Sequence, residues 1–164
     1  MRPGSRLKST PDVKLTFLSV GKDRSGLFSP GVDEYVKRLS HTFKVSVLEL
    51  PESRASGDKA KEEEGQALLG KLSGRDVLVA LDERGKALSS VDFAKWLGRQ
   101  QDSGKDVAFV IGGDEGLSDA VRTKAALVLS LSAMTLPHRL ARLILVEQVY
   151  RGFSILRGEP YHKA

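Results

Sequence analysis

Two runs of six residues are almost wholly apolar, and each is followed by charged residues and glycine. They are Asp76–Leu81 (DVLVAL) and Asp106–Ile111 (DVAFVI). Runs of this length and uniformity are typical of central strands in a parallel sheet, because both faces of such strands are covered. The two runs therefore restrict the chain to folds in which a parallel sheet lies between layers of helix.

Strand and helix patterns alternate along the rest of the chain. Further strands are expected at Lys14–Gly21, Phe43–Leu50 and Leu127–Leu131. Helices are expected over Asp33–Leu39, over Lys59–Leu72, from Ser89 to Gly104, from Ser118 to Ala126, and from Pro137 to about Leu156. Phe43–Leu50 alternates apolar and polar residues, which is typical of a strand near an edge. The alternation predicts an α/β fold with a mostly parallel sheet and helices on both faces.

One charged segment is expected to face solvent, and another is expected to be a loop. The start of the second helix, Lys59–Glu64 (KAKEEE), is predicted to be a solvated face, whereas Ala67, Leu68, Leu69 and Leu72 turn toward the core. The segment Asp82–Gly85, directly after the first central strand, is predicted to be a loop.

The length of 164 residues corresponds to one ordinary domain. The sequence contains no cysteine, which excludes a disulfide framework, a thiolate zinc site and a cysteine nucleophile. A formal net charge of +5 permits a nucleic-acid partner without requiring one. No apolar run approaches the roughly 18 residues of a membrane span, and residues 1–12 lack the apolar stretch of a secretory signal. We expect a disordered basic leader over 1–12, a single domain over 13–164 and a cytoplasmic protein with no membrane partner.

Three connections leave the carboxyl ends of predicted strands, after Leu81, after Ile111 and after Leu131. Ligands of parallel α/β sheets bind at such positions. The first predicted strand is not followed by a G-x-G-x-x-G fingerprint, and the chain has no G-x-x-x-x-G-K-[ST] loop. Dinucleotide and nucleoside-triphosphate sites of those kinds are therefore not expected, whereas a nucleoside held mainly by backbone groups is compatible with the sequence.

The second connection begins with Gly112 and Gly113, which would let a ligand approach the backbone closely. An ordinary turn capped by Asp114 and Ser118 explains the same residues. The string GGDEG is similar to the GGDEF signature of diguanylate cyclases, but it lacks the phenylalanine and leads from a strand into a helix rather than lying in a hairpin. The cyclase interpretation is therefore set aside.

The third connection, Leu131–His138, is apolar and rich in small residues. An adenine ring prefers an apolar slot with backbone donors and acceptors at its edge. An ordinary buried connector fits the same composition, and a histidine near a helix start has a structural role more often than a catalytic one.

The last predicted helix is apolar almost all round, so it must be buried on several sides, and a subunit interface would bury it further. Its polar exceptions are Arg139, Arg142, Glu147, Gln148 and Arg151. Each buried arginine is expected either to form a structural ion pair, as Glu147 and Arg151 can at i, i+4, or to face an anion. Tyr161 and His162 follow the helix in a tail that would contribute chemistry only if it docks.

Four segments resemble the bacterial RlmH family, which are SPOUT-class methyltransferases of large-subunit ribosomal RNA. They are FVIGGDEGLS (Phe109–Ser118), LSLSAMTLPH (Leu129–His138), LARLILVEQVYRGFSILRGEPYHK (Leu140–Lys163) and GKALSS (Gly85–Ser90). The resemblance extends over Lys14–Lys163. It implies an α/β fold with a C-terminal trefoil knot, a homodimer, and S-adenosylmethionine as methyl donor without a metal. It also implies 23S rRNA as substrate, in the ribosome or large subunit, with methylation at ring N3 of a pseudouridine.

The resemblance also implies positions for the site. The donor contacts would be Leu81, Gly112, Gly113, Leu131, Ser132, Ala133, Met134, Thr135, Leu136 and Pro137. Arg151 would stabilise charge and contact RNA, Tyr161 would stack on or orient the base, and His162 would handle the proton. Substrate contacts are also expected at His138 and Arg142. Asp114 stands where we expect proline or another small residue in relatives, and it could repel RNA phosphate or cap the following helix.

Two other functions fit the same fold. One is a non-catalytic ribosome-binding factor, which would not need a donor site. The other is a SPOUT methyltransferase of a different RNA nucleotide, for example a ribose 2′-hydroxyl in tRNA. Binding of S-adenosylmethionine separates the first from an enzyme, and mapping of the methylated nucleotide separates the second.

Overall fold

Five strands form one sheet in the order β2-β1-β4-β3-β5 in the computed structural model, which describes residues 13–163. The strands are β1 (Lys14–Val20), β2 (Lys44–Leu50), β3 (Asp76–Ala87), β4 (Asp106–Ile111) and β5 (Leu127–Ser130). All four pairings between neighbouring strands are parallel. This confirms the parallel sheet and the edge position predicted for β2. The leader predicted over residues 1–12 lies outside the described residues.

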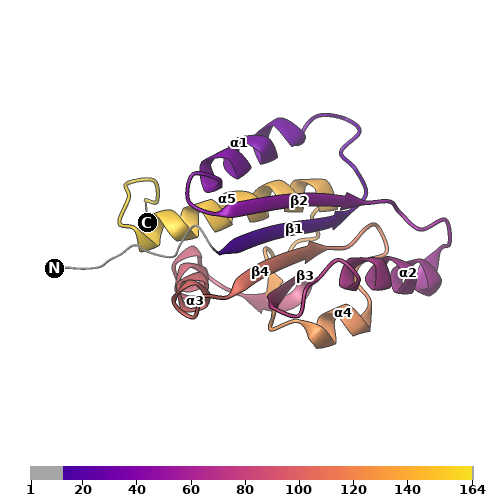
Figure 1. Ribbon diagram of the computed structural model, residues 1–164. Helices are drawn as coiled ribbons and strands as arrows, with labels where there is room; N and C mark the ends of the chain where they lie inside the picture. Colours follow the sequence, from indigo (N-terminus) through magenta and orange to yellow (C-terminus); the bar gives the residue numbers. More distant parts are fainter. Residues whose placement is uncertain (1–12, 164) are drawn as a thin grey trace.

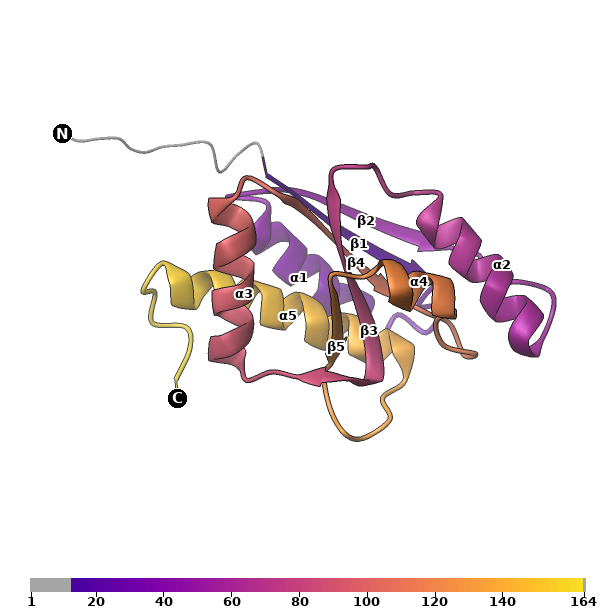
Figure 2. The same ribbon diagram turned by 90° about the horizontal axis from the view of Figure 1, so that it is seen from below.

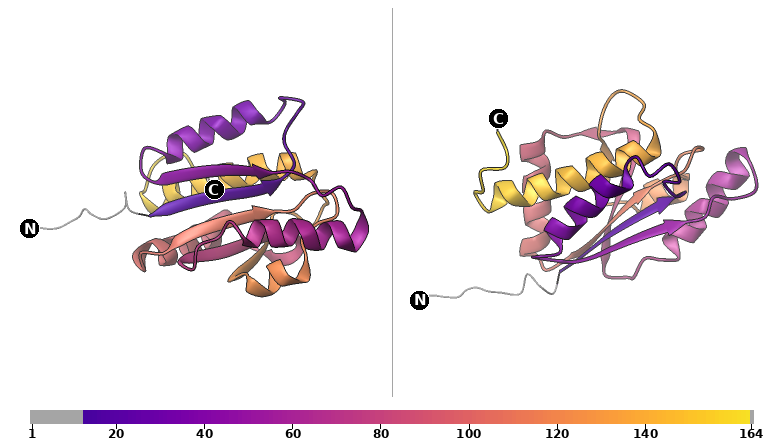
Figure 3. Two further views of the ribbon diagram at one scale, coloured as in Figure 1. Left: turned by 45° about the vertical axis from the view of Figure 1, so that its right-hand side comes forward. Right: turned by 90° about the horizontal axis from the view of Figure 1, so that it is seen from above.

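Helices cover both faces of the sheet, as predicted (Figure 1). The helices are α1 (Ser29–Leu39), α2 (Gly57–Leu69), α3 (Ser90–Asp102), α4 (Asp119–Lys124) and α5 (His138–Leu156). Residues of α1, α3 and α5 pack in the core on one face, and those of α2 and α4 pack on the other. Figures 2 and 3 show α1 and α5 together on one side of the sheet and α2 and α4 on the opposite side. Within residues 13–163, no helix combines the length and the apolar character needed to cross a membrane.

The central strand β4 shows why this sequence forms two cores. Its Val107, Phe109 and Ile111 pack with residues of α1, α3 and α5, whereas Ala108 and Val110 pack with residues of α2 and α4. Successive side chains of a strand point to opposite faces, so an all-apolar run must be covered twice. The ring of Phe109 stacks on that of Phe17 at 5.0 Å between centroids.

The start of α1 differs from the prediction, since the helix begins at Ser29 and not at Asp33. The carboxylate of Asp23 accepts hydrogen bonds from the backbone N–H groups of Phe28 and Ser29, at 2.8 and 2.9 Å. These bonds satisfy backbone donors that a helix start leaves open. A cap from five residues upstream leaves no local sequence pattern, which explains the difference.

The charged start of α2 is not wholly solvated, contrary to the prediction. Glu64 is only 7% exposed, and its Oε2 accepts a hydrogen bond from the backbone N–H of Ser53 at 2.9 Å. Ala67, which was expected to face the core, is exposed. The helix therefore presents a different stripe to the sheet, with Ala60, Glu64 and Leu68 buried.

The loop predicted at Asp82–Gly85 is part of β3. Both Leu81 and Lys86 pair with Leu129 of β5, so the residues between them form a bulge. At Gly85 an added Cβ would lie 2.6 Å from the carbonyl oxygen of Val128, so a larger residue would not fit against β5. The bulge turns charged side chains toward the carboxyl end of the sheet.

Candidate functional site

A cleft of about 540 Å³ opens where β3, β4 and β5 end and α5 begins. Its walls come from the bulge of β3, from the loop Gly112–Leu117 after β4, and from the connection between β5 and α5. These are the three positions that the sequence predicts for a ligand site. A volume of this size is within the range of small-molecule and cofactor sites.

Most residues predicted to contact a donor line this cleft. They are Leu81, Gly112, Gly113, Leu131, Ser132, Met134, Thr135 and Leu136, and His138 is at the same surface. Ala133 and Pro137 are not among the lining residues. Ala133 is exposed, and Pro137 is the N-cap residue of α5. The donor contacts themselves stay a prediction.

Sequence reasoning missed several charged lining residues. They are Lys61, Asp82, Glu83, Arg84, Glu115 and Arg122. The sequence predicts a loop at Asp82–Arg84 and a ligand site after Leu81, but it does not single out these charged side chains as lining residues. Lys61 and Arg122 reach the cleft from α2 and α4, and no local pattern indicates that those helices flank it.

The cleft is lined in part by apolar side chains, which suit a flat heterocycle. These side chains are those of Leu81, Ile111, Leu129, Leu131 and Leu136. The glycines Gly112 and Gly113 bring backbone groups to the same cleft. Such a combination binds a base through apolar contact and orients it through hydrogen bonds.

The glycines of the second loop are required because the loop folds back on itself. Gly113 and Gly116 form an isolated antiparallel bridge, in which the N–H of Gly116 donates to the carbonyl oxygen of Gly113 at 3.0 Å. An added Cβ at Gly112 would lie 2.6 Å from the carbonyl carbon and oxygen of Gly116. Gly116 itself has a φ of +84°, which favours glycine.

Asp114 does not cap α4. The cap is Ser118, whose hydroxyl accepts a hydrogen bond from the N–H of Val121 at 3.3 Å. The Oδ1 of Asp114 lies 3.3 Å from Nδ1 of His138, so it connects the glycine loop to the start of α5. The Nε2 atom of His138 is buried and has no hydrogen-bond partner among residues 13–163.

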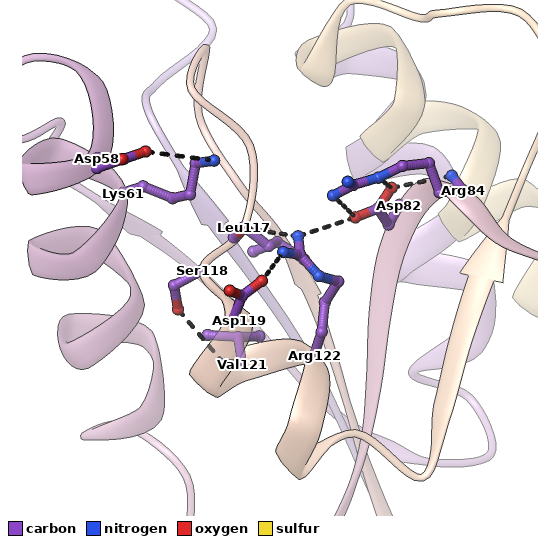
Figure 4. A network of polar contacts seen from close by, with 9 residues as sticks. All are labelled: Asp58, Lys61, Asp82, Arg84, Leu117, Ser118, Asp119, Val121 and Arg122. Atoms are coloured by element: carbon purple, nitrogen blue, oxygen red, sulfur yellow. Dashed lines mark hydrogen bonds and ion pairs between the residues drawn. The ribbon is translucent and has the colours of Figure 1, made fainter.

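A network of arginines and carboxylates joins two walls of the cleft (Figure 4). Arg122 donates to the Asp82 carboxylate at 3.1 Å and to the carbonyl oxygen of Leu117 at 2.7 Å, and it also pairs with Asp119. Burial raises the pKa of Asp82, but hydrogen bonds from Arg84 and the charges of Arg84 and Arg122 outweigh it and lower the pKa overall. One guanidinium thus holds the bulge of β3 against the glycine loop.

Arg151, Tyr161 and His162, predicted to be catalytic, lie together near the C-terminal end of α5. Nη1 of Arg151 donates to Nδ1 of His162 at 3.0 Å, and Nη2 donates to Glu147 at 2.7 Å. The Tyr161 hydroxyl also donates to Glu147, at 2.7 Å, and the Arg151 guanidinium lies over the Tyr161 ring at 4.9 Å from its centroid. The tail is therefore docked on the helix.

The pKa values in this cluster define what each group can do. Burial, followed by hydrogen bonds with Tyr35 and Glu147, raises the pKa of Tyr161, so its hydroxyl stays protonated and acts as a donor. Burial raises the pKa of Glu147, but hydrogen bonds from Arg151 and Tyr161 outweigh it and lower the pKa overall. Because a guanidinium only donates, Nδ1 of His162 accepts, and the neutral ring carries its proton on Nε2.

Replacing Glu147 with glutamine is expected to lower the free energy of unfolding by about 1 kcal/mol at pH 7. A carboxyl whose pKa is lowered on folding stabilises the protein above its unfolded pKa, near 4.3, and this contribution is lost as the pH falls through the folded pKa. The difference between the two proteins should therefore shrink below about pH 4. Urea unfolding at pH 7 and pH 3 measures it, with Glu159→Gln, which removes an exposed pair with Arg157, as control. An equal difference at both pH values would contradict this assignment.

The structure does not bring this cluster to the cleft within one chain. From His138 to Arg151 is 13 residues of continuous helix, which is about 20 Å at the usual rise per residue. The cleft lies at the beginning of α5 and the cluster lies toward its end. A single chain therefore carries the two parts of the predicted site at opposite ends of one helix.

Arg142 forms a structural ion pair, which is one of the two outcomes expected for a buried arginine, and its contact with substrate stays a prediction. Its side chain is 5% exposed, and Nη1 donates to the Glu49 carboxylate at the end of β2 at 2.6 Å. A buried arginine needs such a partner. The sequence could not indicate whether that partner is a carboxylate of the protein or an anionic ligand.

Comparisons with known proteins agree with this architecture. A family model described as "Predicted SPOUT methyltransferase" matches residues 13–162. A protein from an Anaeromyxobacter species named ribosomal RNA large subunit methyltransferase H is 53% identical over 153 residues, covering 92% of this chain and 100% of its own. The protein of the same name from Enterococcus faecalis is 41% identical over 159 residues, with 92% and 100% covered.

A solved structure supports the fold independently. A probable methylase family protein from Haemophilus influenzae superposes with a TM-score of 0.54 at 10% sequence identity, covering 95% of this chain and 72% of that chain. At this identity the likeness concerns the fold alone. The family model and the relatives, which match nearly the whole described chain, identify the family: the chain belongs to the SPOUT methyltransferases, within the family named ribosomal RNA large subunit methyltransferase H.

Proposed function

We propose that the protein transfers a methyl group from S-adenosylmethionine to ring N3 of a pseudouridine in 23S ribosomal RNA. The observation that carries the proposal is the cleft at the carboxyl side of the sheet, which both apolar and charged residues line. The names of the relatives support large-subunit ribosomal RNA as the substrate.

The cleft fits the donor by its chemistry. Leu81, Leu131 and Leu136 would contact the adenine ring, and the backbone of Gly112 and Gly113 would approach it closely. When bound, the donor supplies a methyl group on a positively charged sulfur. The protein's task is then to hold this group in line with the attacking nitrogen, which is mainly a matter of position. In this proposal the segment from the cleft through α5 is threaded as a trefoil knot.

The tail cluster, which consists of Arg151, Tyr161 and His162, would prepare the acceptor. An imide N3–H is a poor nucleophile until its proton leaves, and a nearby cation stabilises the resulting anion. Arg151 supplies that cation. If Arg151 turned toward the pseudouridine ring, its hydrogen bond to His162 would break, and Nδ1 of His162 would be free to take the proton. Tyr161, which stays protonated, would orient the base as a hydrogen-bond donor.

The working unit would be a homodimer. The cluster lies about 20 Å along α5 from the cleft of its own chain, so a second copy is needed to place it beside a cleft. Half-buried and exposed apolar residues of α5, including Leu143, Ile144 and Leu156, would be covered by this contact. A closed twofold dimer would contain two such composite sites.

The test combines donor binding with methyl transfer. Calorimetry is expected to show binding of S-adenosylmethionine, and large ribosomal subunits incubated with labelled donor are expected to gain a methyl group, which mass spectrometry would map to a pseudouridine base. Arg151→Ala and His162→Ala should keep donor affinity and lose transfer. Absence of donor binding would favour a non-catalytic ribosome-binding factor. A label on a ribose or on tRNA would favour another RNA methyltransferase.

A further inference from the structure

Three Lys and Arg side chains are among the residues that line the cleft, and two of them are already paired. Arg84 donates to both oxygens of Asp82, at 3.3 and 3.2 Å. Arg122 is held by Asp82, by Asp119 and by the carbonyl oxygen of Leu117. Both guanidiniums therefore serve the walls of the cleft, and moving either one toward a ligand would break those contacts.

The third cation, Lys61 on α2, has only a weak partner within the part of the chain that the structure describes. Its Nζ lies 4.0 Å from Oδ1 of Asp58, which is at the limit of an ion pair, and the Asp58 side chain is 99% exposed. An exposed pair at this distance contributes little stability. Figure 4 shows the Lys61 side chain extending from α2 toward the loop that precedes α4. Its ammonium group can therefore turn to a ligand at little cost.

The charge of the rim favours a cation at the carboxylate of the ligand. Asp82 is neutralised by Arg84 and Arg122, but Glu83, Asp114 and Glu115 add further carboxylates to the lining of the cleft. At neutral pH an α-amino acid group carries an ammonium and a carboxylate, and the carboxylate would be repelled by an acidic rim unless a cation meets it. The carboxylates of the rim suit the ammonium and the sulfonium, whereas a basic group suits the carboxylate.

We propose that Lys61 binds the α-carboxylate of the methyl donor. This rests on the proposed function, because it assigns one end of the donor within the same cleft. The adenine ring occupies the apolar slot formed by residues such as Leu81 and Leu136, and the amino-acid end extends to the charged rim beside α2. Lys61 then contributes to donor affinity through one charge-assisted hydrogen bond.

The test compares S-adenosylmethionine with decarboxylated S-adenosylmethionine, which keeps the sulfonium and the amine but lacks the carboxylate. Calorimetry is expected to show that Lys61→Met weakens binding of S-adenosylmethionine about tenfold, whereas binding of the decarboxylated compound changes less than twofold. Lys61→Arg should keep most of the affinity because it keeps the charge. Lys59→Met, which removes an exposed lysine of the same helix that does not line the cleft, is the matched control.

Each outcome is decisive. A loss for S-adenosylmethionine alone, restored by arginine, supports the assignment. An equal loss for both compounds, or no loss for either, overturns it while leaving the proposed function intact, because the wild-type protein would still bind the donor. Failure of the wild-type protein to bind either compound overturns the proposed function itself, and this assignment with it.

Discussion

Alanine in place of Gly112 is expected to weaken binding of the methyl donor at least about a hundredfold, because its Cβ would clash with a backbone carbonyl group. The 2.6 Å approach is to the backbone of Gly116, which cannot rotate away as a side-chain end can. The loop would have to open, and its bridge between Gly113 and Gly116 would be lost. Overpacking of this kind costs about 1–3 kcal/mol of stability, and the misplaced loop would no longer form one wall of the cleft.

The matched control is Gly74→Ala, since nothing lies within 4 Å of an added Cβ there. Calorimetry gives the donor affinity of both variants, and urea unfolding gives their stability. The Gly74→Ala protein should match the wild type in both. If the Gly112→Ala protein folded and kept its donor affinity within threefold, the glycine loop would not be part of the donor site.

A mixture of two inactive proteins is expected to regain activity. Arg151→Ala removes the cation of the tail cluster and should reduce methyl transfer about a hundredfold or more, whereas Gly112→Ala removes the donor site. In a dimer of one chain of each kind, one composite site pairs an intact cleft with an intact tail. Equal co-expression makes half of the dimers mixed, and each has one working site of two, so about a quarter of wild-type activity should return.

Differently tagged chains allow the mixed dimers to be purified and assayed directly. Arg151→Ala mixed with His162→Ala is the control. Both changes lie in the tail cluster, so no mixed dimer contains an intact tail cluster. Recovery in the first mixture and not in the second supports sites built from two chains. Purified mixed dimers without activity would mean that each tail serves its own cleft, and the proposed dimer would be wrong.

The layers of this fold could be predicted because they depend on local periodicity. The continuous apolar runs of β3 and β4 identify strands covered on both faces, and the near-complete apolar circumference of α5 identifies a deeply packed helix. Since the ends of parallel strands meet at one edge, the three connections of the cleft followed from the same patterns.

The details that the sequence could not predict depend on partners far along the chain. Arg142 pairs with Glu49, which is 93 residues away, and Asp114 lies beside His138 instead of capping α4. The bulge of β3 arises from its register with β5, and a register between strands has no local signature. The buried carboxylate of Glu64 is a similar case. Its charged neighbours in the sequence predict a solvent-exposed position, but it is buried and bonded to the N–H of Ser53.

The uninterrupted helix α5 has a consequence for how the protein would behave on dilution. A rod of 19 residues packed into the core keeps its two ends at a constant separation, so bending within a chain cannot join cleft and tail. An isolated subunit would bind the donor and yet transfer nothing. When the protein is diluted and its subunits dissociate, specific activity would therefore fall, while donor binding per chain would stay constant.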